Sequence, residues 1–146
     1  MKKIINAADA PEALGPYSQA VEINGTLYLS GQIGIDPGTG KMVTGGVEEQ
    51  TAQVLKNIKA ILRAAGFTIE DVVKSTCYLR DMTDFMAMNK IYGRVYENNP
   101  PVRSAVAVKE LPLGALIEIE TIAVKQQWLI LLLFRDQFQL LLLCEV

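Results

Sequence analysis

Two side chains in the C-terminal half of the chain could act together on a small anionic substrate. Arg103 carries a permanently charged planar fork, which matches a carboxylate through two parallel hydrogen bonds. Glu118 lies in the segment LIEIETIAV of residues 116–124, where alternation gives it apolar neighbours on its own face. A carboxylate beside apolar surface has a raised pKa and can exchange protons near neutrality. The pair predicts a carboxylate clamp and an acid–base group, although an arginine can also form an ordinary surface ion pair.

Other residues could complete such a site. Tyr17 follows a Gly-Pro pair in a restricted turn, and its hydroxyl could position a carboxylate or a water, or it could lie at a subunit interface. Ser30 is followed by Gly31, which permits close approach by another group. Asn89 and Tyr92 are one helical turn apart and could serve either binding or capping and core packing. Glu120 is interpreted as a structural charge.

The elements that would position these residues follow from turn signals and periodicity. Residues 19–30 predict a hairpin around Asn24-Gly25, a type I′ turn signal. Residues 36–46 are rich in turn residues and predict a loop. Apolar residues recur at spacings of three and four over residues 47–65, which predicts a helix capped by Gly66.

The second half adds one strand, one helix and two further strands. Residues 72–80 predict a strand, which would carry Cys77 as a buried apolar residue. Asp84 is expected to cap a helix over residues 85–97. Further strands are expected over residues 103–109 and 116–124. The order ββ-α-β-α-ββ predicts an α+β fold, in which a mixed sheet carries two helices on one face and its other face is covered by further subunits.

Composition excludes several classes of function. The chain has 14 Lys and Arg against 16 Asp and Glu, so it lacks the basic excess typical of nucleic-acid binding. It contains no histidine and no CxxC, which excludes a zinc deaminase of the cytidine type and predicts a site without metal or cofactor. Two cysteines cannot form a disulfide framework, and no signal-peptide pattern opens the chain, so a cytoplasmic location is expected.

The last 21 residues, 126–146, differ in character from the rest of the chain. Two apolar runs, 128–134 and 140–144, flank a polar interruption that contains Arg135 and Asp136. Neither run approaches the ~20 residues that a membrane-spanning helix needs. We therefore expect no membrane span, and we interpret this segment as an apolar extension that takes no part in catalysis.

Four clusters, in this order and spacing, make residues 1–125 resemble the RidA/YjgF (reactive intermediate deaminase) family. They are Gly15-Pro16-Tyr17-Ser18-Gln19-Ala20; Ser30-Gly31-Gln32-Ile33; Asp84-Phe85 with Asn89 and Tyr92; and Pro101-Val102-Arg103-Ser104-Ala105-Val106 with Leu111-Pro112 and Ile117-Glu118-Ile119-Glu120. The resemblance implies a ferredoxin-like subunit, similar to trimeric chorismate mutase, that forms a homotrimer with active sites between subunits. It also implies hydrolysis of 2-imino acids, such as 2-iminobutanoate and 2-iminopropanoate, to 2-keto acids and ammonia.

The resemblance also implies roles for particular residues. Glu118 would be the acid–base group, Tyr17 would lie in the substrate cleft, and Arg103 would hold the substrate carboxylate. Ser30 and Gly31 would contact substrate and water. Ala105 stands where many relatives have cysteine, and its backbone N–H would contact the substrate.

Two alternative functions remain. Some relatives are described as endoribonucleases or translation inhibitors, although RNA cleavage usually needs two acid–base groups and a basic surface. A carboxylate clamp between subunits could also bind keto acids without turnover, as a regulator. In that case, loss of Glu118 would leave binding largely intact.

Overall fold

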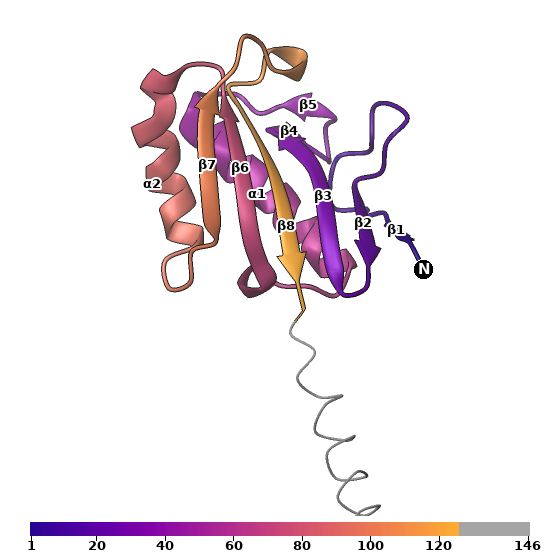
Figure 1. Ribbon diagram of the computed structural model, residues 1–146. Helices are drawn as coiled ribbons and strands as arrows, with labels where there is room; N and C mark the ends of the chain where they lie inside the picture. The colour runs from indigo at the N-terminus through magenta and orange to yellow at the C-terminus, as the bar shows by residue number, and fades with distance from the viewer. Residues whose placement is uncertain (126–146) are drawn as a thin grey trace, which may run out of the picture.

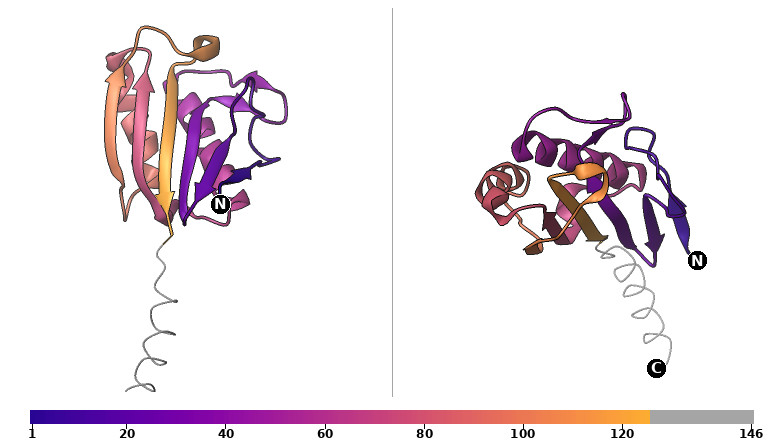
Figure 2. Two further views of the ribbon diagram at one scale, coloured as in Figure 1. Left: turned by 45° about the vertical axis from the view of Figure 1, so that its right-hand side comes forward. Right: turned by 90° about the horizontal axis from the view of Figure 1, so that it is seen from above.

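The computed structural model describes residues 1–125, and the predicted apolar extension of residues 126–146 lies outside the described residues. One six-stranded mixed sheet carries two helices against one of its faces, which confirms the predicted α+β fold (Figures 1 and 2). In sheet order, the strands are β1 (Lys3–Ile5), β2 (Ala20–Ile23), β3 (Thr26–Ile33), β8 (Ile117–Val124), β6 (Val72–Leu79) and β7 (Val102–Ala107). The helices are α1 (Val47–Ala64) and α2 (Phe85–Val95). Strands β6 and β7 pair in parallel, whereas the other neighbours are antiparallel.

Two predicted turns form as the residue types require. Asn24 and Gly25 both have positive φ, 50° and 75°, which gives the type I′ turn between β2 and β3. Gly66 follows α1 with φ 77°, and its N–H donates to the Arg63 carbonyl at 2.9 Å. The Phe67 N–H donates to the Leu62 carbonyl at 2.8 Å, which completes a Schellman motif. Both glycines occupy conformations that side chains with a Cβ rarely adopt.

Several local predictions were wrong. Asp84 makes no capping hydrogen bond, because a short 3₁₀ turn over Met82–Asp84 precedes α2 and the Asp81 carboxylate accepts from the Thr83 N–H at 2.8 Å. The loop predicted over residues 36–46 contains part of a small hairpin, β4 (Ile35–Asp36) with β5 (Lys41–Met42). Strand β1 has only three residues and no extended pattern, so the sequence did not predict it.

The alternation predicted along β8 is confirmed. Ile117, Ile119, Thr121 and Ala123 are at most 1% exposed and face the helices. Glu118, Glu120 and Ile122 lie between them and are partly exposed on the opposite face. No helix of the described chain covers that second face, which we call the open face (Figure 2). The open face therefore presents both apolar side chains and carboxylates.

Candidate functional site

A cleft of about 510 Å³ lies where β3 and β8 meet the loop that precedes β2. Four of the predicted site residues line it together, namely Tyr17, Ser30, Gly31 and Glu118. The remaining lining residues are mostly apolar or small and include Leu14, Pro16, Ile33, Ile35 and Pro112. A concave, largely apolar cavity with a few converging polar groups is typical of a small-molecule site.

A β-bulge in β3 shapes the floor of the cleft. The register between β3 and β8 moves from Leu29 opposite Thr121 to Gln32 opposite Ile119, so β3 gains one residue at Ser30 and Gly31. Ser30 and Gly31 therefore lie within the strand, not at its end as the sequence suggested. Bulges of this kind re-aim backbone and side chains beside functional sites.

Gly31 provides the space in which the Glu118 carboxylate lies. A Cβ added to Gly31 would overlap Oε1 of Glu118 and lie 2.7 Å from its Cδ. The absence of a side chain at Gly31 therefore lets the carboxylate rest directly on the bulged backbone. This packing fixes where Glu118 points and removes part of its contact with water.

The electrostatic surroundings of Glu118 favour proton exchange. Partial burial, and secondarily the negative charge of Glu120, raise the pKa of Glu118 above the usual range for glutamate. Glu120 lies two residues further along the open face and accepts a hydrogen bond of 3.1 Å from the Tyr78 hydroxyl. Two carboxylates line the cleft, and Glu12 is exposed whereas Glu118 is partly buried, so Glu118 is the one suited to act as a base or an acid. Glu120 is engaged with the Tyr78 hydroxyl.

Buried amides that the sequence did not indicate hold the walls of the cleft. The Gln19 side chain accepts from the Ala7 N–H at 2.6 Å and donates to the Pro11 carbonyl at 2.7 Å, so it ties the loop before Tyr17 together. The Asn57 side chain donates to the carbonyls of Ile33 and Ile35 at 3.2 and 2.9 Å. It thereby fastens the end of β3 to α1. Its position within the apolar stripe of α1 was the signal that could have revealed it.

Tyr17 and Ser30 have defined hydrogen bonds of their own. The Tyr17 hydroxyl accepts from the Leu14 N–H at 3.2 Å, and this side chain is 52% exposed at the mouth of the cleft. The Ser30 hydroxyl donates to the Ser18 carbonyl at 2.7 Å. Ser30 therefore joins the Tyr17 loop to β3, and its oxygen lone pairs stay able to accept from a ligand.

Arg103 lies in a second cluster, on edge strand β7 beside α2. Its Nη2 donates to Oδ1 of Asn89 at 2.8 Å. Its guanidinium carbon lies 4.6 Å from the ring centre of Tyr92 and 5.7 Å from that of Phe85. The guanidinium is therefore oriented by one hydrogen bond and two aromatic rings before any ligand arrives.

Tyr92 supports Arg103 from within the core. It is only 4% exposed, and its ring lies 4.5 Å from that of Tyr96. Of the two interpretations that the sequence left open for Tyr92, the burial favours core packing over substrate contact. Asn89 differs, because it holds the guanidinium through the hydrogen bond described above. Phe85 contributes the second ring, a role that the sequence had not indicated.

The two clusters face opposite sides of the sheet. In the β7–β6–β8 register, Arg103 is level with Ser75 and Thr121, both buried beneath the helices. Glu118 is level with Tyr78 and Val106 on the open face. Ala105, level with Cys77, lies on the Arg103 side. One chain therefore cannot direct Arg103 and Glu118 at the same small molecule.

Replacing Gly31 with alanine should lower kcat/KM for the reaction proposed below by about 10- to 100-fold, since a misplacement of about 1 Å can cost ~100-fold in rate. The new Cβ would push the Glu118 carboxylate out of position. Gly93→Ala is the matched control, because a Cβ there meets nothing within 4 Å. Steady-state kinetics that show equal activity for both variants would contradict this assignment of Gly31.

Two further properties of residues 1–125 bear on function. No group of three or more His, Cys, Asp and Glu side chains in this part of the chain could hold a metal ion. No helix among the same residues has the length and apolar content needed to cross a membrane.

Cys77 is fully buried, as predicted, and burial raises the pKa of its thiol to about 11.

The chain is similar to known proteins over most of its length. The family model for Endoribonuclease L-PSP matches residues 7–125. A RutC family protein of Pyrococcus horikoshii is 51% identical over 126 residues, which cover 86% of this chain and 100% of that protein. The 2-iminobutanoate/2-iminopropanoate deaminase of mouse is 48% identical over 125 residues, covering 86% of this chain and 93% of the mouse protein.

A solved structure shows the same fold. A protein of unknown function of the conserved Rid family, from Yersinia pestis, superimposes with a TM-score of 0.83 at 47% identity. The match covers 86% of this chain and 100% of the Yersinia chain. The chain therefore belongs to the RidA/YjgF family, whose family model carries the description Endoribonuclease L-PSP.

Proposed function

We propose that the protein hydrolyses 2-imino acids, with their enamine tautomers, to 2-keto acids and ammonia. The observation that carries the proposal is the Glu118 carboxylate resting on Gly31 in a small-molecule cleft, with a pKa raised by burial. The mouse relative is named for this reaction on 2-iminobutanoate and 2-iminopropanoate. Both substrates carry a carboxylate next to the imine carbon, which suits the oriented guanidinium of Arg103.

The reaction needs one group that moves protons and one that orients the substrate. Glu118 as carboxylate takes a proton from water while the water oxygen bonds to the carbon of the protonated imine, and the C=N electron pair moves to the nitrogen, which becomes an amine. Glu118 then gives its proton to that amine. The C–N bond breaks as the hydroxyl oxygen forms the C=O bond of the keto acid, and the hydroxyl proton passes to the Glu118 carboxylate, which releases it to the departing ammonia or to solvent. A carboxyl whose pKa is raised by burial can act as the base in the first step and as the acid in the second.

The opposite placement of the two clusters supports a site shared between chains. Arg103 would come from one chain, and Glu118, Tyr17, Ser30 and Gly31 from its neighbour. The open face offers a surface for such assembly, because Tyr28, Val106 and Val124 are 49%, 44% and 36% exposed on it. Apolar side chains gathered on one sheet face mark an association surface. We propose a homotrimer, as the family resemblance implies.

Sedimentation equilibrium should therefore show a trimer of the 16.0 kDa chain across the concentrations at which the protein is active. Val106→Glu, near the C-terminal end of edge strand β7, should shift the equilibrium toward monomer and reduce turnover together. An active monomer would rule out a site shared between chains.

The direct test of the activity is release of keto acid and ammonia from freshly generated 2-iminopropanoate and 2-iminobutanoate. The expected result is a rate above that of spontaneous hydrolysis, proportional to protein concentration and abolished by heat denaturation. Hydrolysis at the spontaneous rate, from protein shown to be folded and assembled, would contradict the proposed function.

A second candidate is RNA cleavage, which the name of the family model suggests. The chain has a net charge of −2 and no histidine, so it offers neither a basic excess nor the commonest pair of acid–base groups for this reaction. A labelled single-stranded RNA incubated with the protein should therefore stay intact. Cleavage that is lost in Glu118→Gln would instead favour this second candidate.

A further inference from the structure

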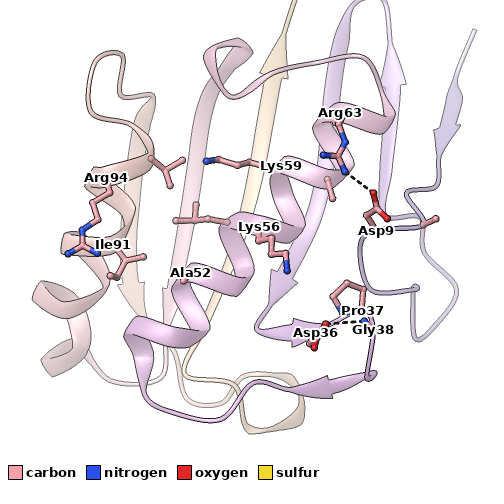
Figure 3. A pocket seen from close by; sticks show the side chains of 14 residues that line it. Asp9, Asp36, Pro37, Gly38, Ala52, Lys56, Lys59, Arg63, Ile91 and Arg94 are labelled. Atoms are coloured by element: carbon pink, nitrogen blue, oxygen red, sulfur yellow. Dashed lines mark hydrogen bonds and ion pairs between the residues drawn. The ribbon is translucent and has the colours of Figure 1, made fainter.

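Helix α2 presents two faces of different character. Its outer residues Ile91 and Arg94 line a groove of about 820 Å³ along α1 and α2, in which the charged side chains point in different directions (Figure 3). Met88, Tyr92 and Tyr96, spaced four residues apart, lie on the other face and are at most 5% exposed. The charges of the outer groove therefore do not converge on one point, whereas the inner face carries two buried phenol hydroxyls.

Four buried hydroxyls come together beneath α2, and we call them the hydroxyl cluster: those of Ser75, Tyr92, Tyr96 and Thr121. Their residues are 0%, 4%, 5% and 1% exposed. Ser75 on β6 is directly opposite Thr121 on β8, and its hydroxyl also faces both tyrosine hydroxyls. None of the four hydroxyls has a hydrogen-bond partner of good geometry within residues 1–125. The cluster therefore lacks the pairing that buried polar groups normally have.

The chemistry of the hydroxyl cluster suits a water molecule. Burial raises the pKa of Tyr92 and of Tyr96 above the usual tyrosine value, so both hydroxyls keep their protons at neutral pH. Each hydroxyl can donate one hydrogen bond and accept others, which lets it bond to either side of a water. Buried waters in proteins typically make about three hydrogen bonds to polar groups that would otherwise be unpaired. The hydroxyl cluster supplies at least that number of partners.

The hydroxyl cluster lies directly behind Arg103. Ser75 is paired with Arg103 across β6 and β7, so both side chains lie on the same face of the sheet. The ring of Tyr92 lies 4.6 Å from the guanidinium carbon of Arg103 and 4.5 Å from the ring of Tyr96. Tyr92 therefore contacts Arg103 with its ring and belongs to the cluster through its hydroxyl.

We propose that the hydroxyl cluster binds one ordered water, which fixes the ring of Tyr92 and through it the direction of the Arg103 guanidinium. The water holds the Tyr92 hydroxyl, so the ring cannot shift away from the guanidinium that it supports. Ser75, Tyr96 and Thr121 are then positioning residues, since they act through Tyr92. The water site itself is independent of any activity, whereas its effect on turnover rests on the proposed function.

A high-resolution crystal structure of the full-length chain tests the water site directly. We expect one water within hydrogen-bonding distance of at least three of the four hydroxyls. A variant that combines Tyr96→Phe with Thr121→Val keeps the side-chain shapes but removes two hydroxyls. It should lose this water, and its Arg103 should occupy more than one conformation. Direct bonds among the native hydroxyls without a water, or an unmoved Arg103 in the variant, would overturn the proposal.

Kinetics test whether the cluster acts through Arg103. The same double variant should lower kcat/KM for imine hydrolysis, and weaken 2-ketobutyrate binding, by about 3- to 10-fold, because a less fixed guanidinium orients the carboxylate less well. In an Arg103→Ala background the two substitutions should cause no further loss, whereas a general structural fault would lower activity in both backgrounds. Thr51→Val is the matched control. It removes an equally buried hydroxyl, which donates to the Val47 carbonyl at 2.6 Å, and should leave kcat/KM unchanged.

The outcomes separate this inference from the proposed function. Native kcat/KM in the double variant, or an equal loss in both backgrounds, would overturn the inference while hydrolysis by the native protein stands. No hydrolysis by the native protein would contradict the proposed function instead. In that case the two crystal structures alone decide whether the water is bound and whether it fixes Arg103.

Discussion

Replacing Arg103 with alanine should lower kcat/KM for imine hydrolysis by at least ~100-fold, since a lost charged hydrogen-bonding partner costs about 3 kcal/mol. The guanidinium is oriented by Asn89 and by the ring of Tyr92, so it presents its remaining donors in a fixed direction. Without it, the substrate carboxylate has no fork to bind, and the imine carbon can rotate away from Glu118. The loss should appear in kcat as well as in KM, because orientation is part of the catalysis.

Two companion variants make this result specific. Arg103→Lys should recover only part of the activity, because an ammonium keeps the charge but cannot form two parallel hydrogen bonds. Arg80→Ala removes an exposed arginine at the end of β6 and should leave turnover unchanged. Near-native hydrolysis by Arg103→Ala would show that the carboxylate clamp lies elsewhere.

Replacing Glu118 with glutamine should slow hydrolysis by about 100- to 10,000-fold, the usual contribution of a positioned acid–base group. Glutamine has nearly the same shape and would still fit over Gly31, so calorimetric binding of 2-ketobutyrate should change little. Separation of turnover from binding distinguishes an acid–base role from a purely structural one. A folded Glu118→Gln variant that loses both turnover and 2-ketobutyrate binding would contradict the assignment. A variant that retains both would contradict it as well.

The pH dependence provides a second readout for Glu118. Because burial raises its pKa, the carboxylate form needed to activate water is lost at a higher pH than for an ordinary glutamate. The acid limb of kcat/KM should therefore lie above the usual glutamate range and vanish in Glu118→Gln. Glu120→Gln is the matched control. It removes the neighbouring negative charge, so the acid limb should move to lower pH while activity is retained.

Local sequence signals predicted the main elements of the fold. Asn24-Gly25 and Gly66 adopt positive φ, as their residue types indicated, and the period of apolar residues gave α1 its bounds within one residue. The alternation along β8 correctly grouped Glu118 with Glu120 and Ile122 on one face. These predictions succeeded because each feature depends on residues that are close in the sequence, through the sterics of turns and the burial of one face of an element.

Features that depend on tertiary contacts were not predicted. The bulge at Ser30 and Gly31 arises from pairing with β8, almost 90 residues away along the chain, and no local pattern marks it. The stacking of Arg103 on Phe85 and Tyr92 depends on how α2 packs beside β7. The separation of Arg103 from Glu118 depends on strand order, since only the β8–β6–β7 register shows that they face opposite sides.

That separation is the basis of the central claim, that each active site takes Arg103 from one chain and Glu118 from another. The most direct test unfolds equal amounts of Arg103→Ala and Glu118→Gln together, refolds the mixture and measures imine hydrolysis. Each variant refolded alone should be nearly inactive. The mixture should recover about one quarter of native activity, because random assembly pairs an intact Arg103 with an intact Glu118 at that frequency. Activity in the mixture no higher than in the separate variants would contradict a site shared between chains.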